Sequence, residues 1–167
     1  MEGPKFVLDA NVFIEAARRY YAFDLAPGFW ESLIRQTKNG RVQSIDRVKK
    51  ELERGKDQLA EWAKGDFDFG FDSTDEVDVI ELYSEIVNWV QSQNQFTGAA
   101  KAEFARGADG WLVAYARVKG SIVVTQEVLA PPEAKIKVKI PNVCQAFNLP
   151  YVDTFEMLRR LGVKWSR

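Results

Sequence analysis

Short apolar runs that predict buried strands alternate with longer amphipathic segments along the chain, and this alternation constrains the fold most strongly. The first run is Phe6-Val7-Leu8, and a second, "SIVVTQE", covers 121–127. A short run at 41–45 and an alternating one at 134–141 predict two further strands. Strands separated by helices favour an α/β domain, in which a central, mainly parallel β-sheet is flanked by α-helices as an α/β/α sandwich.

The helical segments are recognised by apolar residues three and four positions apart and by residues that start or stop helices. In 76–93, for example, Val79, Ile86 and Val90 fall on one stripe. We also expect Asp46 to cap the helix that it begins. The predicted helices cover 26–40, 46–55, 76–93, 97–107, 108–120 and 155–162, besides one directly after the first strand. No repeat or linker interrupts the sequence, so we expect a single domain over 1–167.

The composition excludes several kinds of catalytic site. Histidine is absent, which excludes Ser-His-Asp and Cys-His catalysis and zinc sites built on imidazole. Cys144 is the single cysteine, so no internal disulfide can form, and we expect a reducing, cytoplasmic location. We expect no signal peptide and no membrane span, since no stretch approaches the roughly 18 apolar residues that a span needs. Carboxylates are the groups left for catalysis.

Four acidic residues occupy positions where an α/β sheet builds its sites. Asp9 directly follows the first strand and Glu127 ends the run at 121–127, and carboxyl ends of parallel strands are where such sites form. Asp109 begins one predicted helix and Glu51 lies on another. Each also has an ordinary structural interpretation. Asp9 is then a turn residue and Glu127 an exposed residue at a strand end. Asp109 is then a helix cap, and Glu51 is a solvated residue on a helix.

The four acids together favour a metal site. Convergent carboxylates repel one another and are tolerated when a divalent cation neutralises them. With no histidine and one cysteine, the oxygen-binding ions Mg²⁺ and Mn²⁺ are the expected occupants. The net charge of −1 gives no overall basic field, so nucleic-acid binding would need a local patch or bridging cations.

Four segments, taken in order, resemble the motifs of PIN-domain nucleases, which include the VapC-like toxin ribonucleases. The likeness spans nearly the whole chain. It implies a PIN-like fold and a Mg²⁺- or Mn²⁺-dependent endoribonuclease that hydrolyses RNA phosphodiester bonds. It also leaves open a role as the toxin of a toxin–antitoxin pair, silenced by an antitoxin protein. The segments are "VLDANVFI", "VKKEL", "ADGWLVAYA" and "IVVTQE".

The resemblance assigns roles residue by residue. One departure is that Glu127 stands where aspartate is commoner, so its carboxylate lies one methylene further from the backbone. The catalytic metal ligands that the resemblance implies are Asp9, Glu51, Asp109 and Glu127, and the supporting residues that it implies are Asn11 and Thr125.

Two other functions stay open at this point. The substitution at Glu127 motivates a PIN-like domain that binds RNA or protein with weak or no catalysis. The second alternative is a phosphatase-like enzyme with Asp9 as an aspartyl nucleophile, although Asn11 stands where such enzymes have another aspartate.

Three further patterns have both a structural and a functional interpretation. Lysines at 135, 137 and 139 protect an edge strand or contact an RNA backbone. The "RRYY" at 18–21 is a surface helix end or a stacking and phosphate-binding pair. Phenylalanines at 67, 69 and 71 turn inward from an edge strand or loop, or form a contact for an antitoxin or a homodimer.

Overall fold

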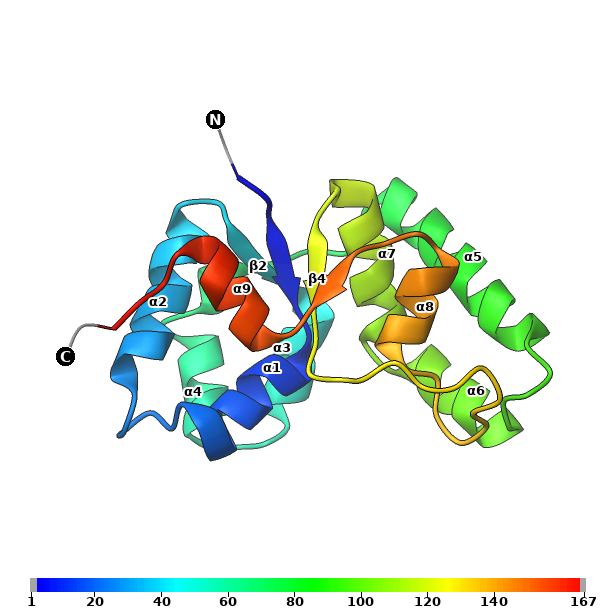
Figure 1. Ribbon diagram of the computed structural model, residues 1–167, viewed down its shortest axis with the longest axis horizontal. Helices are drawn as coiled ribbons and strands as arrows, with labels where there is room; N and C mark the ends of the chain where they lie inside the picture. Colours follow the sequence, from blue (N-terminus) through cyan, green and yellow to red (C-terminus); the bar gives the residue numbers. More distant parts are fainter. Residues whose placement is uncertain (1–2, 166–167) are drawn as a thin grey trace.

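The computed structural model describes residues 3–165, so both ends of the expected 1–167 domain lie outside the described residues (Figure 1). Within this range the sheet has five strands, all parallel, in the order β3-β2-β1-β4-β5. The predicted α/β fold is therefore confirmed. The strands are β1 (Phe6–Leu8), β2 (Val42–Ile45), β3 (Phe71–Asp72), β4 (Ile122–Val124) and β5 (Tyr151–Val152).

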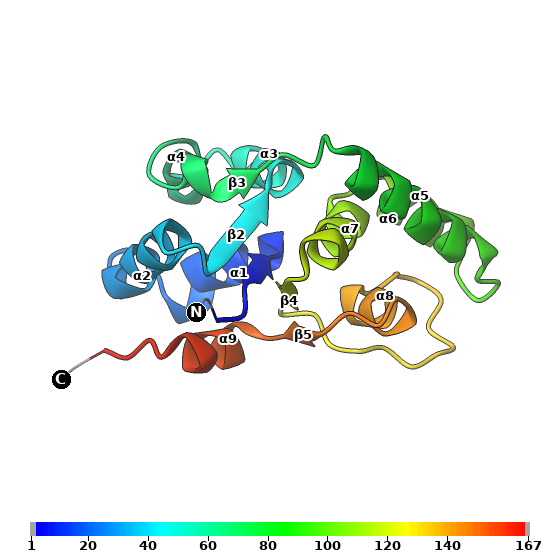
Figure 2. The same cartoon turned by 90° about the horizontal axis from the view of Figure 1, so that it is seen from above.

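Helices cover both faces of the sheet. Helices α1, α2, α4 and α9 lie on one side, and α5, α6, α7 and α8 lie on the other (Figures 1 and 2). No helix within 3–165 is both long and apolar enough to cross a membrane. The helices are α1 (Ala10–Glu15), the π-helical turn η1 (Ala16–Tyr20), α2 (Pro27–Lys38), α3 (Asp46–Glu53), α4 (Gln58–Lys64), the 3₁₀ turn η2 (Asp68–Gly70), α5 (Val77–Ser92), α6 (Gly98–Arg106), α7 (Asp109–Lys119), α8 (Ile140–Ala146) and α9 (Thr154–Leu161).

Strand β1 lies at the centre of the sheet, where helices cover it on both faces. Its three residues are fully buried, as the continuous apolar run predicts. Phe6 pairs with Val42 of β2 on one side, and Leu8 pairs with Val124 of β4 on the other. Because the strands are parallel, the residues that follow β1 and β4 meet at the same edge of the sheet.

Close packing fixes the helices that follow Asp9 and Asp109. On one side, Phe13 of α1 packs against Trp62 and Phe67, with ring centroids 6.0 and 5.8 Å apart. On the other, Gly110 lets α7 approach its neighbours, because a Cβ there would lie 3.0 Å from the ring of Phe104. Both helices therefore start from well-defined positions.

The strand predicted at 134–141 is wrong. This segment is irregular up to Lys139, and helix α8 begins at Ile140. Its alternating pattern has another cause, since Val138 is buried against the core while Ile136 is 84% exposed. The edge beside β4 is occupied instead by β5, a two-residue strand too short to be recognised from its sequence.

Other details also differ from the predictions. Strand β4 ends at Val124, so Glu127 lies in the following loop and not at the strand end. Asp46 is the first residue of α3 and not its N-cap, and its carboxylate accepts hydrogen bonds from the backbone N–H of Arg47 and from the backbone and hydroxyl of Thr74. Phe67 is buried as expected, whereas Phe69 is half-exposed. Helices α4 and α8 were not among the predicted elements.

Candidate active site

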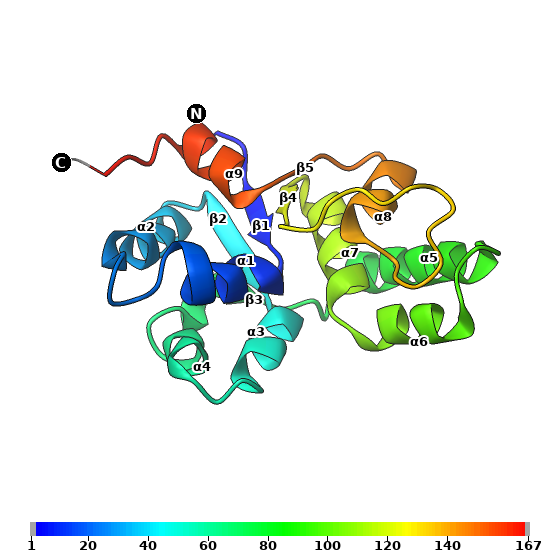
Figure 3. The same ribbon diagram turned by 60° about the horizontal axis from the view of Figure 1, so that its bottom comes forward.

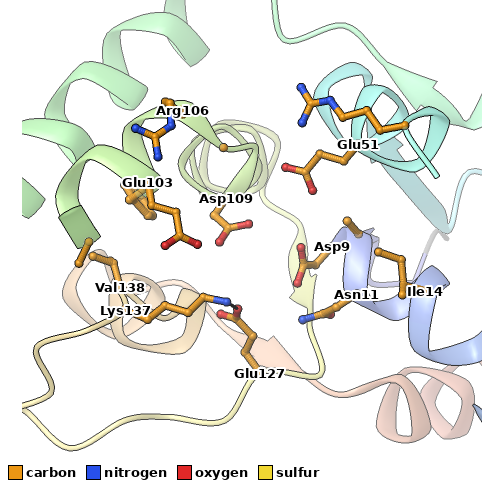
Figure 4. A pocket seen from close by; sticks show the side chains of 15 residues that line it. Asp9, Asn11, Ile14, Glu51, Glu103, Arg106, Asp109, Glu127, Lys137 and Val138 are labelled. Carbon is orange, nitrogen blue, oxygen red and sulfur yellow. Dashed lines mark ion pairs between the residues drawn. The ribbon is translucent and has the colours of Figure 1, made fainter.

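A cavity of about 380 Å³ opens beside the carboxyl ends of β1 and β4. Carboxylates from five separate parts of the chain line it, and Figure 4 shows them around one space. Helices α1, α3 and α6, which carry residues of this lining, can be followed in Figure 3. The acidic residues are Asp9, Glu51, Glu103, Asp109 and Glu127, and the basic ones are Arg54, Arg106 and Lys137.

Asp9 is the most buried of these acids, with 4% of its surface exposed. Its backbone N–H donates to Val124 of β4 at 3.0 Å, and its carboxylate accepts a hydrogen bond from the Thr125 hydroxyl at 3.0 Å. Burial, followed by the charges of Asp109 and Glu127, raises the pKa of Asp9 well above its usual value. The structure therefore holds a carboxyl group in a place that is unfavourable for a lone negative charge.

Asp109 is the first residue of α7, and its neighbour Ala108 is held by Glu51. The Ala108 N–H donates to Glu51 Oε1 at 3.1 Å, which joins α3 to the start of α7. Burial, followed by the charges of Glu127 and Glu51, raises the pKa of Asp109 to about 7, while Lys137 opposes the shift. The three predicted residues Asp9, Glu51 and Asp109 thus face one cavity.

Glu127 also lines this cavity, but both oxygens of its carboxylate have partners. Oε1 accepts a hydrogen bond from the backbone N–H of Ile140 at 2.8 Å, at the start of α8. Oε2 forms an ion pair with Lys137 at 2.9 Å, and the Glu127 side chain is 8% exposed. Glu127 therefore anchors the segment that runs from β4 to α8.

The two predicted supporting residues join the ends of β1 and β4. Asn11 Oδ1 accepts a hydrogen bond from the backbone N–H of Gln126 at 3.1 Å. The Thr125 hydroxyl donates to Asp9 and accepts from the backbone N–H of Glu127 at 3.1 Å. These contacts fix the loop that follows β4 relative to Asp9.

Sequence reasoning did not assign Glu103 or Lys137 to this site. Glu103 is an exposed acid on α6 with no motif around it. The sequence pattern places Lys137 among three lysines that protect an edge strand or contact an RNA backbone, and only the irregular path of 128–139 brings its ammonium group to Glu127. The start of this segment is held against α8 by Asn142, whose side chain makes two hydrogen bonds of 2.9 Å with the backbone of Ala130.

Oxygen atoms are the metal donors that the cavity offers, because Cys144 is buried elsewhere and histidine is absent. Within residues 3–165, no three acidic or thiol side chains form a ready-made metal cluster. Burial, followed by the neighbouring carboxylates, raises the pKa values of Asp9 and Asp109, so a cation placed among these acids would stabilise their charged forms. A hard divalent cation that keeps part of its water shell has the matching chemistry.

Comparison with curated proteins of known function gave no match. Three solved structures share the fold of this chain, at identities of 14–18%. They are VapBC2 from Rickettsia felis bound to a DNA fragment from its promoter (TM-score 0.52, 14% identity), FitAcB from Neisseria gonorrhoeae (0.52, 18%) and FitAB bound to the IR36 DNA fragment (0.53, 16%). The alignments cover 89%, 87% and 97% of this chain and 97%, 95% and 99% of the matched chains, respectively.

This likeness confirms the fold expected from the PIN-domain motifs. A family model described as a domain of unknown function, DUF4411, matches residues 6–165, which is almost the entire described chain. The chain therefore belongs to the DUF4411 family and has a PIN-like fold, the fold of the VapC-like proteins.

Proposed function

We propose that this protein is a Mg²⁺- or Mn²⁺-dependent endoribonuclease. The observation that carries the proposal is the convergence of Asp9, Glu51 and Asp109, from three separate elements, on one open cavity. Burial and repulsion between neighbouring carboxylates raise the pKa values of two of these acids, as is common at functional sites.

In this proposal Asp9, Asp109 and Glu51 hold the metal. The Asp109 carboxylate accepts no hydrogen bond within the described residues, and Glu51 uses one oxygen for the Ala108 N–H, so both retain free carboxylate oxygens. Mg²⁺ is commonly bound by few carboxylates together with water and substrate phosphate oxygens. When bound, such an ion activates water and stabilises charge on a scissile phosphate.

The chain's own residues prepare the site. Thr125 keeps the Asp9 carboxylate turned toward the cavity, and Glu51 fixes the start of α7 and with it Asp109. For Glu127 we propose a holding role in place of the ligand role that the motif implied, because Lys137 and the start of α8 occupy its two oxygens. Lys137 then presents a positive charge beside the acids, where a phosphate can reach it.

A protein partner and a cytoplasmic location are part of the same proposal. The similar structures are the VapBC2, FitAcB and FitAB assemblies, two of them bound to DNA. We propose that the chain is the toxin of a toxin–antitoxin pair and that an antitoxin silences it. Co-expression with the product of the neighbouring reading frame tests this: stable co-purification and loss of cleavage are expected, and a fully active, unpaired chain contradicts it.

Cleavage of labelled single-stranded RNA is the direct test of the nuclease. With Mn²⁺ or Mg²⁺ the wild-type chain should cut, chelation should stop it, and Asp9→Asn and Asp109→Asn should each lose at least about a hundredfold in rate. Glu31→Gln, a change at an exposed acid on α2, is the matched control. Equal cleavage by wild type and Asp9→Asn over several RNA substrates contradicts the proposal.

A catalytically weak, RNA-binding domain is the second candidate, and the pairing of Glu127 with Lys137 is the observation that favours it. In that case the chain should still bind RNA in the presence of a chelator. Its cleavage rate should stay at background with either metal and in every variant. The same RNA panel therefore separates the two candidates.

A further inference from the structure

A second cavity, of about 510 Å³, adjoins the acidic one. Three residues, Asn11, Glu127 and Lys137, line both cavities and form the boundary between them. The second cavity lies on the side of η1 and of the segment after β4, and Tyr20 and Lys139 contribute to its lining. A chain molecule bound in the acidic cavity can therefore continue into the second one over this boundary.

The charges of the second cavity leave one ammonium group unbalanced. Glu127 is paired with Lys137 at 2.9 Å, and Glu15 is paired with Arg19 at 3.4 Å. Lys139 is half-buried, and its ammonium group makes no hydrogen bond or ion pair within the described residues. A partly desolvated ammonium without a counter-charge is unfavourable, and an anion placed in this cavity would satisfy it.

Tyr20 gives the same cavity an aromatic surface. It is 49% exposed and ends the π-helical turn η1, a kind of turn that is frequent at functional sites. Its ring packs edge-on against Phe155 of α9, with centroids 5.4 Å apart and planes at 81°. This contact supports the ring from one side in a cavity that also holds Lys139.

An aromatic ring beside a lysine is the combination that proteins use for single-stranded nucleic acid. The base stacks on the ring, and the lysine neutralises the backbone phosphate. A paired base inside a duplex cannot offer its face to a side chain. Gln126 adds a polar group to the lining, and its side-chain oxygen is already held by the backbone and hydroxyl of Thr154.

We propose that the second cavity is a nucleotide subsite for single-stranded RNA, in which a base stacks on Tyr20 and the adjacent phosphate binds Lys139. The neighbouring phosphodiester then passes Lys137 and enters the acidic cavity. The placement of the strand relative to the cut rests on the proposed nuclease, whereas the binding of the strand does not.

Binding of fluorescein-labelled oligoadenylate RNA of about ten nucleotides, measured by anisotropy in EDTA, tests the subsite without cleavage. Tyr20→Leu should weaken binding about fivefold or more, and Tyr20→Phe should restore it. Lys139→Met should also weaken binding and reduce the salt dependence by about 0.7 in log–log slope. Lys135→Met is the matched control, because this exposed lysine of the same segment lines neither cavity, and it should bind as wild type does.

Three outcomes overturn the subsite: unchanged binding by both Tyr20→Leu and Lys139→Met, equal loss in the Lys135→Met control, or equal affinity for the same strand annealed to oligouridylate. Circular dichroism of each variant shows that it is folded. Failure of the subsite is distinguishable from failure of the nuclease. Cleavage with unchanged binding in the variants rejects only the subsite, and reduced binding without any wild-type cleavage rejects only the nuclease.

Discussion

The hydroxyl of Thr125 donates a hydrogen bond to the carboxylate of Asp9 at 3.0 Å, although 116 positions separate the two residues. The same oxygen accepts the backbone N–H of Glu127 at 3.1 Å. One buried side chain therefore sets the orientation of the acid that follows β1 and the path of the loop after β4. Removing it should affect both.

Thr125→Val keeps the shape of the side chain and removes the hydroxyl. We expect the free energy of unfolding to fall by about 1–3 kcal/mol, because the Asp9 carboxylate and the Glu127 N–H lose their partner. The pKa of Asp9 should rise further, since this hydrogen bond lowers it. Urea denaturation and the pH profile of cleavage measure the two effects. Thr125→Ser retains the hydroxyl, and a loss as large as that of the valine variant would contradict the explanation.

Asp109→Asn should stabilise the metal-free chain at pH 7–8 while it abolishes cleavage. The folded-state pKa of Asp109 is about 7 against a usual value of 3.8, so its ionisation opposes folding at neutral pH. We expect a gain of about 1–2 kcal/mol, less than the shift alone implies because water partly screens the group. Thermal unfolding in EDTA measures it, and a destabilised variant would contradict the prediction.

The pH dependence of that stability has a defined sign. At pH values between the usual pKa of Asp109, 3.8, and its folded-state pKa of about 7, Asp109 binds more protons in the folded chain than in the unfolded chain. The contribution of this group is therefore fully present below its usual pKa and is lost as the pH rises through about 7. In Asp109→Asn this pH-dependent contribution should be missing from unfolding curves recorded over the same range.

Binding of Mn²⁺ should weaken as the pH falls below about 7, because the ion must displace protons from Asp109 and Asp9. The affinity should drop up to about tenfold per pH unit for each proton released. Isothermal titration calorimetry in buffers of different ionisation enthalpy counts the protons. Asp109→Asn should bind Mn²⁺ weakly at every pH, and a wild-type affinity that is independent of pH from 5.5 to 8 would contradict the assignment of these ligands.

Glu127→Gln and Lys137→Met together distinguish a holding role for Glu127 from a ligand role. If Glu127 holds the segment 128–139, the glutamine variant loses the ion pair with Lys137 and should increase hydrogen exchange in that segment, while Mn²⁺ affinity changes less than about threefold. Lys137→Met should leave the hydrogen bond to Ile140 in place. If Glu127 is instead a ligand, its glutamine variant loses metal affinity, and Lys137→Met gains affinity because a competing cation is gone.

The sequence was sufficient to predict the two strands that build the site, because β1 and β4 are apolar runs followed directly by polar residues. Asp9 and Thr125 meet because parallel pairing of β1 with β4 is a property of the fold class. The convergence of Glu51 with Asp109 followed from the motif order.

The partners of Glu127 could not be predicted in the same way. They depend on the route of 128–139, which is fixed by the Asn142–Ala130 hydrogen bonds and by the burial of Val138. The alternation around Lys137 is equally compatible with an edge strand, so its pattern alone does not give its position.

The long separations within the site have a consequence for how the protein is made. Asp9 and Glu51 are synthesised early, but the contact of Asp9 with Thr125 spans 116 positions and that of Glu51 with Ala108 spans 57. A growing chain that has not passed β4 has no assembled cavity. If the chain is the ribonuclease proposed above, its site is thereby kept incomplete while it is still beside the ribosomal RNA and the message that encodes it, so synthesis and activity are separated in time.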